Sequence, residues 1–335
     1  MLPEKILSVN FKKMTIPIID LTNPCFHIHY TEKQWLKLIK KSKMQYLLAK
    51  LYPSFVKRLI VRYSIIAEGY ISASEKQPFL NGLSTYVAKL PAGFTLIKNN
   101  FLDKQAQKLL FPATVKLRFN TYCSMQFETL LPQLKKNEFD ELRFINIAGA
   151  TCIDNLNVLL LLNRYDPGIL SGRKISIYCL DLESSCYDLG QLFLERLNTE
   201  SGYLKNLSVH FKFIRFDWNK PDSLSRFLCS LKISDAITAV CSEGGMFEYN
   251  TMEAIENLLS IIHRYVSTFT FVFGDIIKEK NHLHPFISKS LESHNFEVYA
   301  HGLTLLSKAA RQTGFKLIAF DKNNPLYICF ALKPA

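Results

Sequence analysis

Cysteine pairs of the Cys-x-x-Cys type are absent from this sequence of 335 residues, although it contains eight cysteines. Four of them lie inside apolar runs, namely Cys179, Cys229, Cys241 and Cys329. Isolated cysteines of this kind are typical of reduced, buried thiols rather than of disulfide frameworks or zinc sites. We therefore expect a cytoplasmic protein.

Long hydrophobic runs are also lacking. The longest aliphatic run, Val158–Leu162, is far shorter than the roughly 18 to 20 residues that span a bilayer. Residues 1–10 carry charged side chains and no long apolar core. Neither a transmembrane segment nor a secretory signal is therefore predicted.

Motifs of several large enzyme classes are missing. No Gly-x-x-x-x-Gly-Lys-Ser/Thr loop is present, which argues against a P-loop nucleotide hydrolase. No nucleophile elbow is present either, which argues against a hydrolase. His27 and His29, and likewise His282 and His284, are spaced to share one face of an extended segment. No cluster of acids or cysteines completes a metal site around them, so no metal is expected.

Acidic residues are absent from the segment Lys33–Arg62, which contains nine basic residues interleaved with apolar ones. The formal charge of +12 lies entirely in residues 1–140, because basic and acidic residues are equal in number beyond them. The apolar spacing predicts one or two amphipathic helices interrupted near Pro53. Three interpretations remain open: a solvated basic helix face, a surface for an acidic partner or anionic lipid, and nucleic-acid binding.

The pattern of the chain changes near residue 140, and we expect two domains, residues 1–138 and 139–335. The first is predicted to be mainly helical. In the second, short apolar strands alternate with amphipathic helices, as in a parallel sheet built from βαβ units. The predicted strands are 144–148, 174–180, 208–216, 236–241, 267–274, 315–320 and 326–332, the last two forming a hairpin. The expected helices include 154–164, with Asp154 as its N-cap, and 250–265. The predicted fold is thus α/β, with a Rossmann-like seven-stranded sheet and a basic, mainly helical N-terminal cap.

Small residues follow the first predicted strand, at the edge where a doubly wound sheet binds its ligand. The turn Ala148-Gly149-Ala150 would let backbone N–H groups approach a ligand closely, beside a helix N-terminus that favours negative charge. Glu243 follows the fourth strand, and we expect it to contact a ligand because a carboxylate after a buried strand needs a partner.

Acidic and aromatic residues follow the second and third predicted strands. Asp181 is placed to accept hydrogen bonds from ribose hydroxyls. Asp217 offers a carboxylate and the adjacent Trp218 a flat apolar surface, a combination suited to an adenine ring. Both aspartates are also compatible with helix caps or turns, and Trp218 with a place in the core.

These strand ends and the terminal hairpin resemble the class I S-adenosylmethionine-dependent methyltransferases over residues 141–333. The resemblance implies that the turn after the first strand holds the methionine part of S-adenosylmethionine, that Asp181 binds the ribose, and that Asp217 binds the adenine amino group. Asn146, Ala148, Ala150 and Cys152 stand where the family has an acid and glycines. The implied cofactor site comprises Asn146, Ala148, Gly149, Ala150, Asp181, Asp217, Trp218, Ser242, Glu243 and Gly244.

The pair Glu243-Gly244, followed by Tyr249, is loosely similar to an element of the leucine carboxyl methyltransferase-like and polyketide O-methyltransferases. That resemblance implies methyl transfer to an oxygen of a small-molecule, carboxylate or peptide-like acceptor. Arg118 or Tyr122 could hold a carboxylate acceptor. A hydroxyl acceptor would need a general base, for which Glu243 or His301 is available.

Two other functions remain open on the sequence alone. One is a catalytically lapsed methyltransferase-like binding module, because the glycine loop is altered. The other is an RNA methyltransferase that uses the basic cap.

Overall fold

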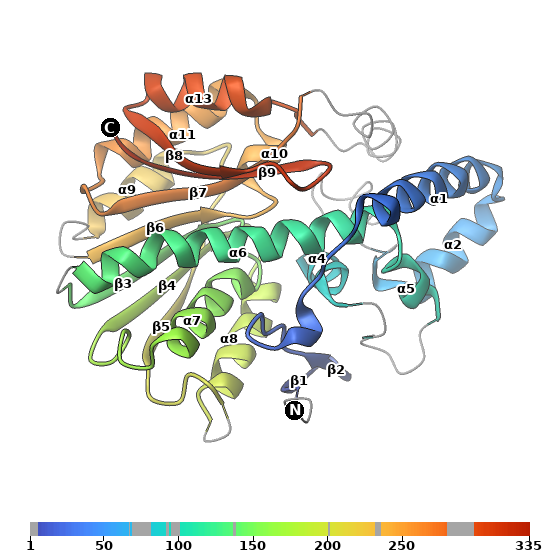
Figure 1. The fold of residues 1–335 in the computed structure, drawn as a ribbon, viewed down its shortest axis with the longest axis horizontal. Helices are drawn as coiled ribbons and strands as arrows, with labels where there is room; N and C mark the ends of the chain where they lie inside the picture. Colours follow the sequence, from blue (N-terminus) through green and yellow to red (C-terminus); the bar gives the residue numbers. More distant parts are fainter. Residues whose placement is uncertain are drawn as a thin grey trace.

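Seven strands form one sheet in the computed structural model, in the order β5-β4-β3-β6-β7-β9-β8 (Figure 1). The structure describes residues 6–66, 68, 82–91, 94, 101–136, 139–199, 202–231, 236–279 and 298–335. The strands are β3 (Glu141–Ile147), β4 (Lys174–Asp181), β5 (Ser208–Arg215), β6 (Ala236–Ser242), β7 (Thr270–Ile277), β8 (Phe315–Asp321) and β9 (Tyr327–Pro334). The first five are parallel, whereas β9 pairs antiparallel with both β7 and β8. The predicted α/β sheet with its terminal hairpin is confirmed.

Helices cover both faces of the sheet. The described helices of this part are α7 (Ile153–Tyr165), α8 (Ser185–Leu197), α9 (Asp222–Ser230), α10 (Met246–Tyr249), α11 (Met252–Arg264) and α13 (Gly302–Gln312). Residues of α7 and α8 share one hydrophobic cluster with one sheet face, and residues of α9, α11 and α13 share a second cluster with the other. Burial of both faces explains why the central strands are apolar almost throughout.

The N-terminal part is mainly helical and shares the core of the sheet. It contains a hairpin of β1 (Ser8–Phe11) and β2 (Met14–Pro17), a short helix η1 (Pro24–Phe26), α1 (Glu32–Leu51), α2 (Ser54–Tyr63), α4 (Gly82–Lys89), α5 (Phe101–Ala106) and α6 (Leu110–Lys136). Ile16, Tyr86 and Phe119 are buried in the same cluster as Phe144 and Leu159. The domain boundary at residue 138 therefore stays a prediction, although both sides of it pack into one core.

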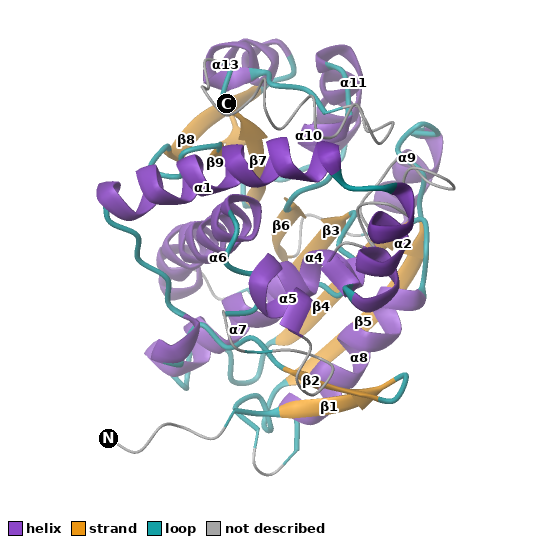
Figure 2. Ribbon diagram, turned by 90° about the vertical axis from the view of Figure 1, so that its right-hand side faces the viewer, coloured by secondary structure: helices purple, strands orange, loops and turns teal. Residues whose placement is uncertain are grey.

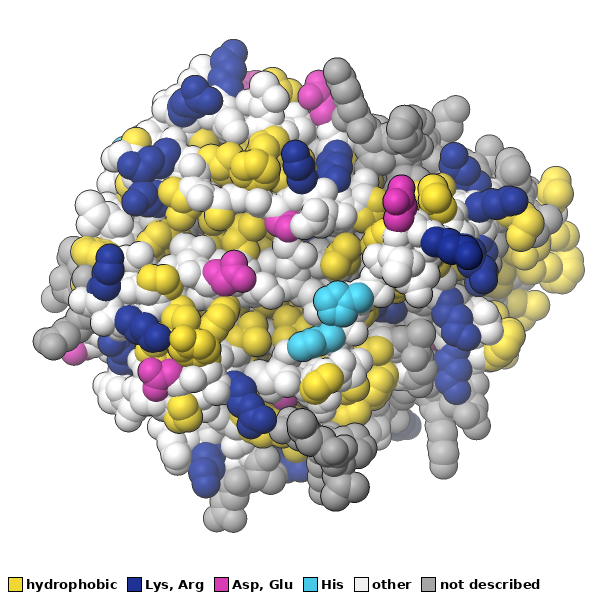
Figure 3. Space-filling model, viewed as in Figure 1, with side chains coloured by type: hydrophobic (Ala, Val, Ile, Leu, Met, Phe, Trp, Pro, Cys, Tyr) yellow, Lys and Arg dark blue, Asp and Glu magenta, His cyan; other side chains and the backbone are white. Residues whose placement is uncertain are grey.

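Helices of the N-terminal part lie over the carboxyl ends of the strands. Figure 2 looks onto this edge and shows α1, α4 and α5 in front of the strand ends. At the far end of the molecule, α1 and α2 carry hydrophobic side chains beside a column of Lys and Arg (Figure 3). Among the described residues, no helix combines the length and the hydropathy that a membrane span requires.

Two predicted helix starts are wrong. Helix α7 begins at Ile153 after Cys152, so Asp154 lies in the first turn and is not the N-cap. Its carboxylate instead accepts hydrogen bonds from Asn146. The helix predicted at 250–265 is α11, which starts at Met252, because the Thr251 side chain caps it by accepting from the Ala254 N–H.

Candidate functional site

A cavity lies at the carboxyl ends of β3, β4 and β6, beneath α4. It contains most of the residues that the sequence singled out. Those that line it are Arg118, Asn146, Ala148, Gly149, Ala150, Asp181, Trp218, Glu243 and Gly244. The protein therefore has a cavity at the edge of the sheet where a doubly wound fold is expected to bind its ligand.

The turn after β3 keeps a backbone shape that favours glycine, although it contains two alanines. Ala148 has φ +58°, Ala150 has φ +47° and Cys152 has φ +48°. L residues adopt such angles at a cost on the order of 1–3 kcal/mol each, and such strain concentrates at functional sites. The two methyl groups face glycines: a Cβ on Gly245 would lie 2.7 Å from that of Ala148, and one on Gly82 would lie 2.8 Å from that of Ala150.

Asp181 stands at the end of β4 and faces this turn. Its carboxylate accepts hydrogen bonds from the N–H of Ala150 at 3.0 Å and of Glu183 at 3.4 Å. Burial raises the pKa of the Asp181 carboxyl. Each oxygen keeps a lone pair for another donor, so the residue can accept hydrogen bonds from two hydroxyls at once.

A second acid, Asp154, lies beside Asn146 on the cavity wall. The Asn146 Nδ2 donates to both Asp154 oxygens at 2.9 Å and to the Oδ1 of Asn155 at 2.7 Å. Burial raises the pKa of Asp154 to about 6. Asp154 thus supplies an acidic group from α7 beside Asn146, the position in β3 where the resemblance led us to expect an acid.

Two aromatic rings face each other on another wall. Trp218 and Tyr249 both line the cavity, and their rings lie 6.4 Å apart at 10° between planes. Asp217 is not among the lining residues; its Oδ1 accepts from the Asn219 N–H at 3.0 Å, an ordinary turn contact. The structure therefore places Trp218 in the wall of the cavity, whereas Asp217 does not line it.

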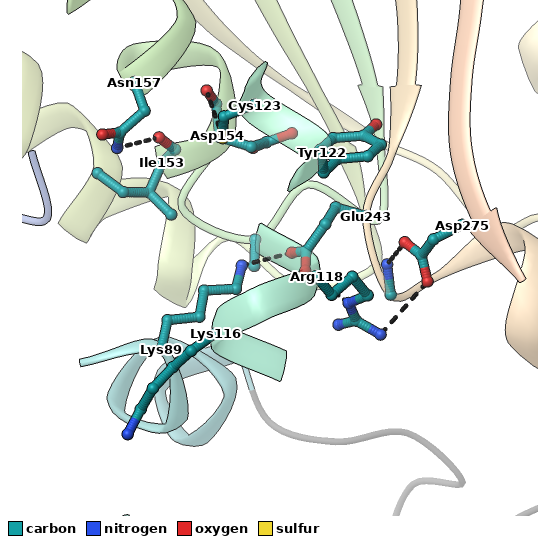
Figure 4. Close-up of polar contacts among 12 residues, drawn as sticks. Lys89, Lys116, Arg118, Tyr122, Cys123, Ile153, Asp154, Asn157, Glu243 and Asp275 are labelled. Atoms are coloured by element: carbon teal, nitrogen blue, oxygen red, sulfur yellow. Dashed lines mark hydrogen bonds and ion pairs between the residues drawn. The ribbon is translucent and has the colours of Figure 1, made fainter. Parts of the chain in front are cut away.

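The side of the cavity near α6 is a network of buried ionic groups. Glu243 contacts the Lys89 Nζ at 2.5 Å and the Arg118 Nε at 2.8 Å. Figure 4 shows Lys89 reaching Glu243 from α4 while Arg118 extends toward Asp275. The Arg118 guanidinium also donates to Asp275 at 3.3 Å and to Glu248, and it lies 4.4 Å from the centre of a tyrosine ring in β9. Each charge is compensated, as burial requires.

The ionic network also sets proton affinities. Burial acts to raise the pKa of Glu243, but Arg118 and Lys89 outweigh it, so that the pKa is lowered. For Glu248 burial dominates and, aided by the nearby Asp275, holds the pKa well above its usual range. Glu243 is thus a poor proton acceptor, and the general-base role predicted for it is unsuited to its surroundings.

Three predicted site residues are not among those that line the cavity: Tyr122, Ser242 and His301. The Tyr122 hydroxyl donates to the Phe273 carbonyl at 3.2 Å and accepts from the Ser242 N–H at 2.9 Å. The Ser242 hydroxyl donates to the Ile147 carbonyl at 2.9 Å. The His301 Nε2 lies 2.8 Å from a backbone carbonyl between α10 and α11. Their polar atoms hold elements together, so the structure does not bring these side chains to a ligand.

Sequence reasoning missed four residues of this site: Lys89, Asp154, Glu248 and Asp275. The sequence predicted Asp154 only as the N-cap of a helix. The sequence offered one indication of a role for Lys89, namely a single charged residue at the end of a helix that has no other charge. Glu248 and Asp275 meet Arg118 across 130 and 157 residues of chain, a pairing that no local pattern reports.

No protein-family model and no curated protein matches the sequence. Solved structures do match. A protein from Bordetella parapertussis described as a possible exported protein is 11% identical, with a TM-score of 0.55 over 92% of this chain and 98% of its own. A DUF574 family protein from Streptomyces avermitilis is 9% identical, with a TM-score of 0.52 over 75% of this chain and 97% of its own. Magnesium protoporphyrin IX methyltransferase from Synechocystis, solved with bound S-adenosylhomocysteine, is 10% identical. Its TM-score is 0.41, over 66% of this chain and 87% of its own.

The fold of this chain is the class I methyltransferase fold. The seven-stranded sheet, its parallel part up to β7 and the terminal hairpin of β8 and β9 agree with the fold that the sequence resemblance implied.

Proposed function

We propose that this protein is an S-adenosylmethionine-dependent methyltransferase that transfers a methyl group to an oxygen of a small-molecule or carboxylate acceptor. The observation that carries the proposal is the turn after β3. It keeps its strained, left-handed backbone at Ala148 and Ala150, and Asp181 anchors it from β4. A chain with no ligand to hold there would gain stability by relaxing this turn.

The residues of the cavity fit S-adenosylmethionine. Asp181 would accept the ribose hydroxyls, and Trp218 would offer a face to the adenine ring. The N–H groups of Gly149 and Thr151 and those at the start of α7 suit the carboxylate of the methionine part. Asp154 would receive its ammonium group, because a buried carboxylate with a raised pKa gains from an adjacent cation. When bound, the cofactor supplies an electrophilic methyl group on its sulfonium.

Lys89 is the group that we assign to the acceptor. Its ammonium has three donors, of which one contacts Glu243 at 2.5 Å, and it lies 5.0 Å from the centre of the Phe119 ring. The remaining donors can orient a carboxylate or another anionic oxygen. Such an acceptor is already nucleophilic and requires positioning in a water-poor cavity rather than a general base. Arg118, which the sequence suggested for this role, is instead held by three carboxylates.

The two tryptophans of the chain allow a direct test. In the variant Trp35→Phe the only remaining indole is Trp218, so its fluorescence should fall on titration with S-adenosylmethionine as the adenine stacks on it. Trp218→Phe retains only Trp35, which packs from α1 against Leu110 and Tyr327 and does not line the cavity. This variant is the matched control, with no expected change.

The outcome separates the proposal from its rivals. Quenching in Trp35→Phe alone, with formation of S-adenosylhomocysteine when acceptors are added, supports a methyltransferase. No quenching at millimolar cofactor would identify a lapsed binding module instead. Product formation only with added RNA would move the acceptor to nucleic acid.

A further inference from the structure

Large apolar side chains are exposed at the end of the molecule formed by α1 and α2. Their exposed fractions run from 43% for Tyr52 to 78% for Leu51. We call this surface the α1–α2 tip, defined by Leu36, Met44, Leu51, Tyr52, Phe55 and Leu59. Large apolar side chains exposed together on neighbouring helices indicate an interaction site.

The fold itself does not use these side chains. The opposite face of α1 packs on the body through Trp35, Leu38 and Ile39, which join a cluster with Leu110 and Tyr327. The hydroxyl of Ser42 also accepts a hydrogen bond from the Leu110 N–H at 3.2 Å. Phe55 and Leu59 are four residues apart on α2, so they share one face. The apolar surface of the tip is therefore additional to the core.

Exposed basic side chains accompany this apolar surface. The segment Lys33–Arg62 contains nine basic residues and no acidic one. Lys33, Lys37, Lys40 and Lys43 are exposed on α1, and within the described chain none of them has an ion-pair partner. Figure 3 shows Lys and Arg side chains standing next to the hydrophobic end of the molecule.

We propose that the α1–α2 tip docks on an anionic lipid bilayer, with the apolar side chains entering the interface and the lysines contacting acidic headgroups. Basic helices with exposed Leu, Phe and Tyr bind membranes in this way. A second copy of the chain is a poor partner, because it would oppose two segments of nine positive charges each. RNA would use the charge but would leave Leu36, Leu51 and Leu59 exposed.

This surface acts independently of the proposed catalytic site. None of the residues that define the tip lines the cavity at the carboxyl ends of the strands. Membrane docking can thus be present whether or not the protein transfers methyl groups, and it can be measured without a methyl acceptor.

Sedimentation with lipid vesicles tests the proposal on the full chain. Vesicles of phosphatidylcholine alone are compared with vesicles of phosphatidylcholine and phosphatidylserine, at about 150 mM salt. The variant K37Q/K40Q/K43Q removes exposed charge from α1, and F55S/L59S removes apolar contact from α2. The control K205Q/K308Q/K316Q makes the same change in net charge at exposed lysines outside the tip.

We expect binding only to vesicles that contain phosphatidylserine. K37Q/K40Q/K43Q should lower the partition coefficient roughly 100-fold, because each lysine near an anionic surface contributes roughly fivefold. The control should lower it less than about threefold. F55S/L59S should weaken binding at least about tenfold with an unchanged circular dichroism spectrum.

Other results would overturn the proposal. They are equal binding to both kinds of vesicle, equal losses in the tip and control variants, or tight binding of single-stranded RNA without any binding to anionic vesicles.

Discussion

At the scale of single residues, the fold shifts the pKa of Asp154, a carboxyl group that lines the cavity. Burial raises its pKa from 3.8 to about 6, although Lys89 and the Asn146 side chain favour the charged form. The charged carboxylate is therefore a cost to the folded protein at neutral pH. A bound ammonium group would offset that cost, which links folding stability to ligand binding.

The variant Asp154→Asn should separate these two effects. A pKa higher in the folded than in the unfolded chain contributes stability at low pH that is lost as the pH rises from about 4 through about 6. At pH 7.5 the variant should have a free energy of unfolding about 2–3 kcal/mol above that of the unaltered chain, and the gap should shrink toward pH 5. Urea denaturation from pH 5 to 8 measures it.

The same variant should bind S-adenosylmethionine at least about tenfold more weakly, since the charge that receives the ammonium group is gone. Asp188→Asn, at an exposed position of α8, is the control for both measurements. A stability gap that does not change with pH would contradict the role given to Asp154.

Residue roles could be predicted where the chemistry is local. Asp181 and Trp218 follow strands whose ends were recognisable, so their arrival at the cavity was predictable. Asp217 follows a strand equally closely, yet its carboxylate is used by the next turn at Asn219. Tyr122 could not be placed, because helical periodicity does not report which face of α6 meets the cavity, and His301 lies just before α13, where no periodic pattern applies.

At the scale of elements, the turn after β3 shows how two loops adapt to each other. The glycines expected in this turn are alanines, while Gly82 and Gly245 stand opposite their methyl groups. In each of the two contacts, one residue has a methyl group and the residue opposite has none. The sequence showed the alanines, but the compensating glycines lie on α4 and after β6, and only the tertiary structure brings them together.

A double-mutant cycle tests this complementarity. Gly245→Ala would place a Cβ 2.7 Å from that of Ala148, so we expect a loss of about 1–3 kcal/mol in the free energy of unfolding. Adding Ala148→Gly should restore at least about half of the loss, since it removes the facing methyl group and relieves the positive φ. Urea denaturation of the two single variants and the double variant gives the coupling.

Gly168→Ala is a suitable control, because the nearest atom to its added Cβ, apart from its chain neighbours, would be the Asp166 Oδ1 at 3.4 Å. That change should alter the free energy of unfolding by less than about 0.5 kcal/mol. Additive losses in the cycle would show that the two loops are not coupled through these methyl groups.

At the scale of the whole molecule, alternating strand and helix patterns were sufficient to predict the sheet, its parallel part and the terminal hairpin. The boundaries moved by up to three residues, as for β7, which runs from Thr270 rather than from residue 267. The ionic network around Arg118 could not be predicted, because its partners come from α4, β7 and the loop and short helix after β6. Local patterns define the elements, whereas the site arises where distant elements meet.

The central claim is that this cavity binds S-adenosylmethionine with Asp181 on the ribose, and calorimetric titration of three proteins tests it most directly. The unaltered chain should bind one cofactor molecule, and Asp181→Ala should weaken binding roughly 10- to 150-fold, as expected for hydrogen bonds to a charged group worth about 1.5–3 kcal/mol. Asp217→Ala removes an acid that follows the neighbouring strand outside the cavity, and its affinity should be unchanged. Equal affinities in the two variants, or no binding to the unaltered chain, would contradict the account.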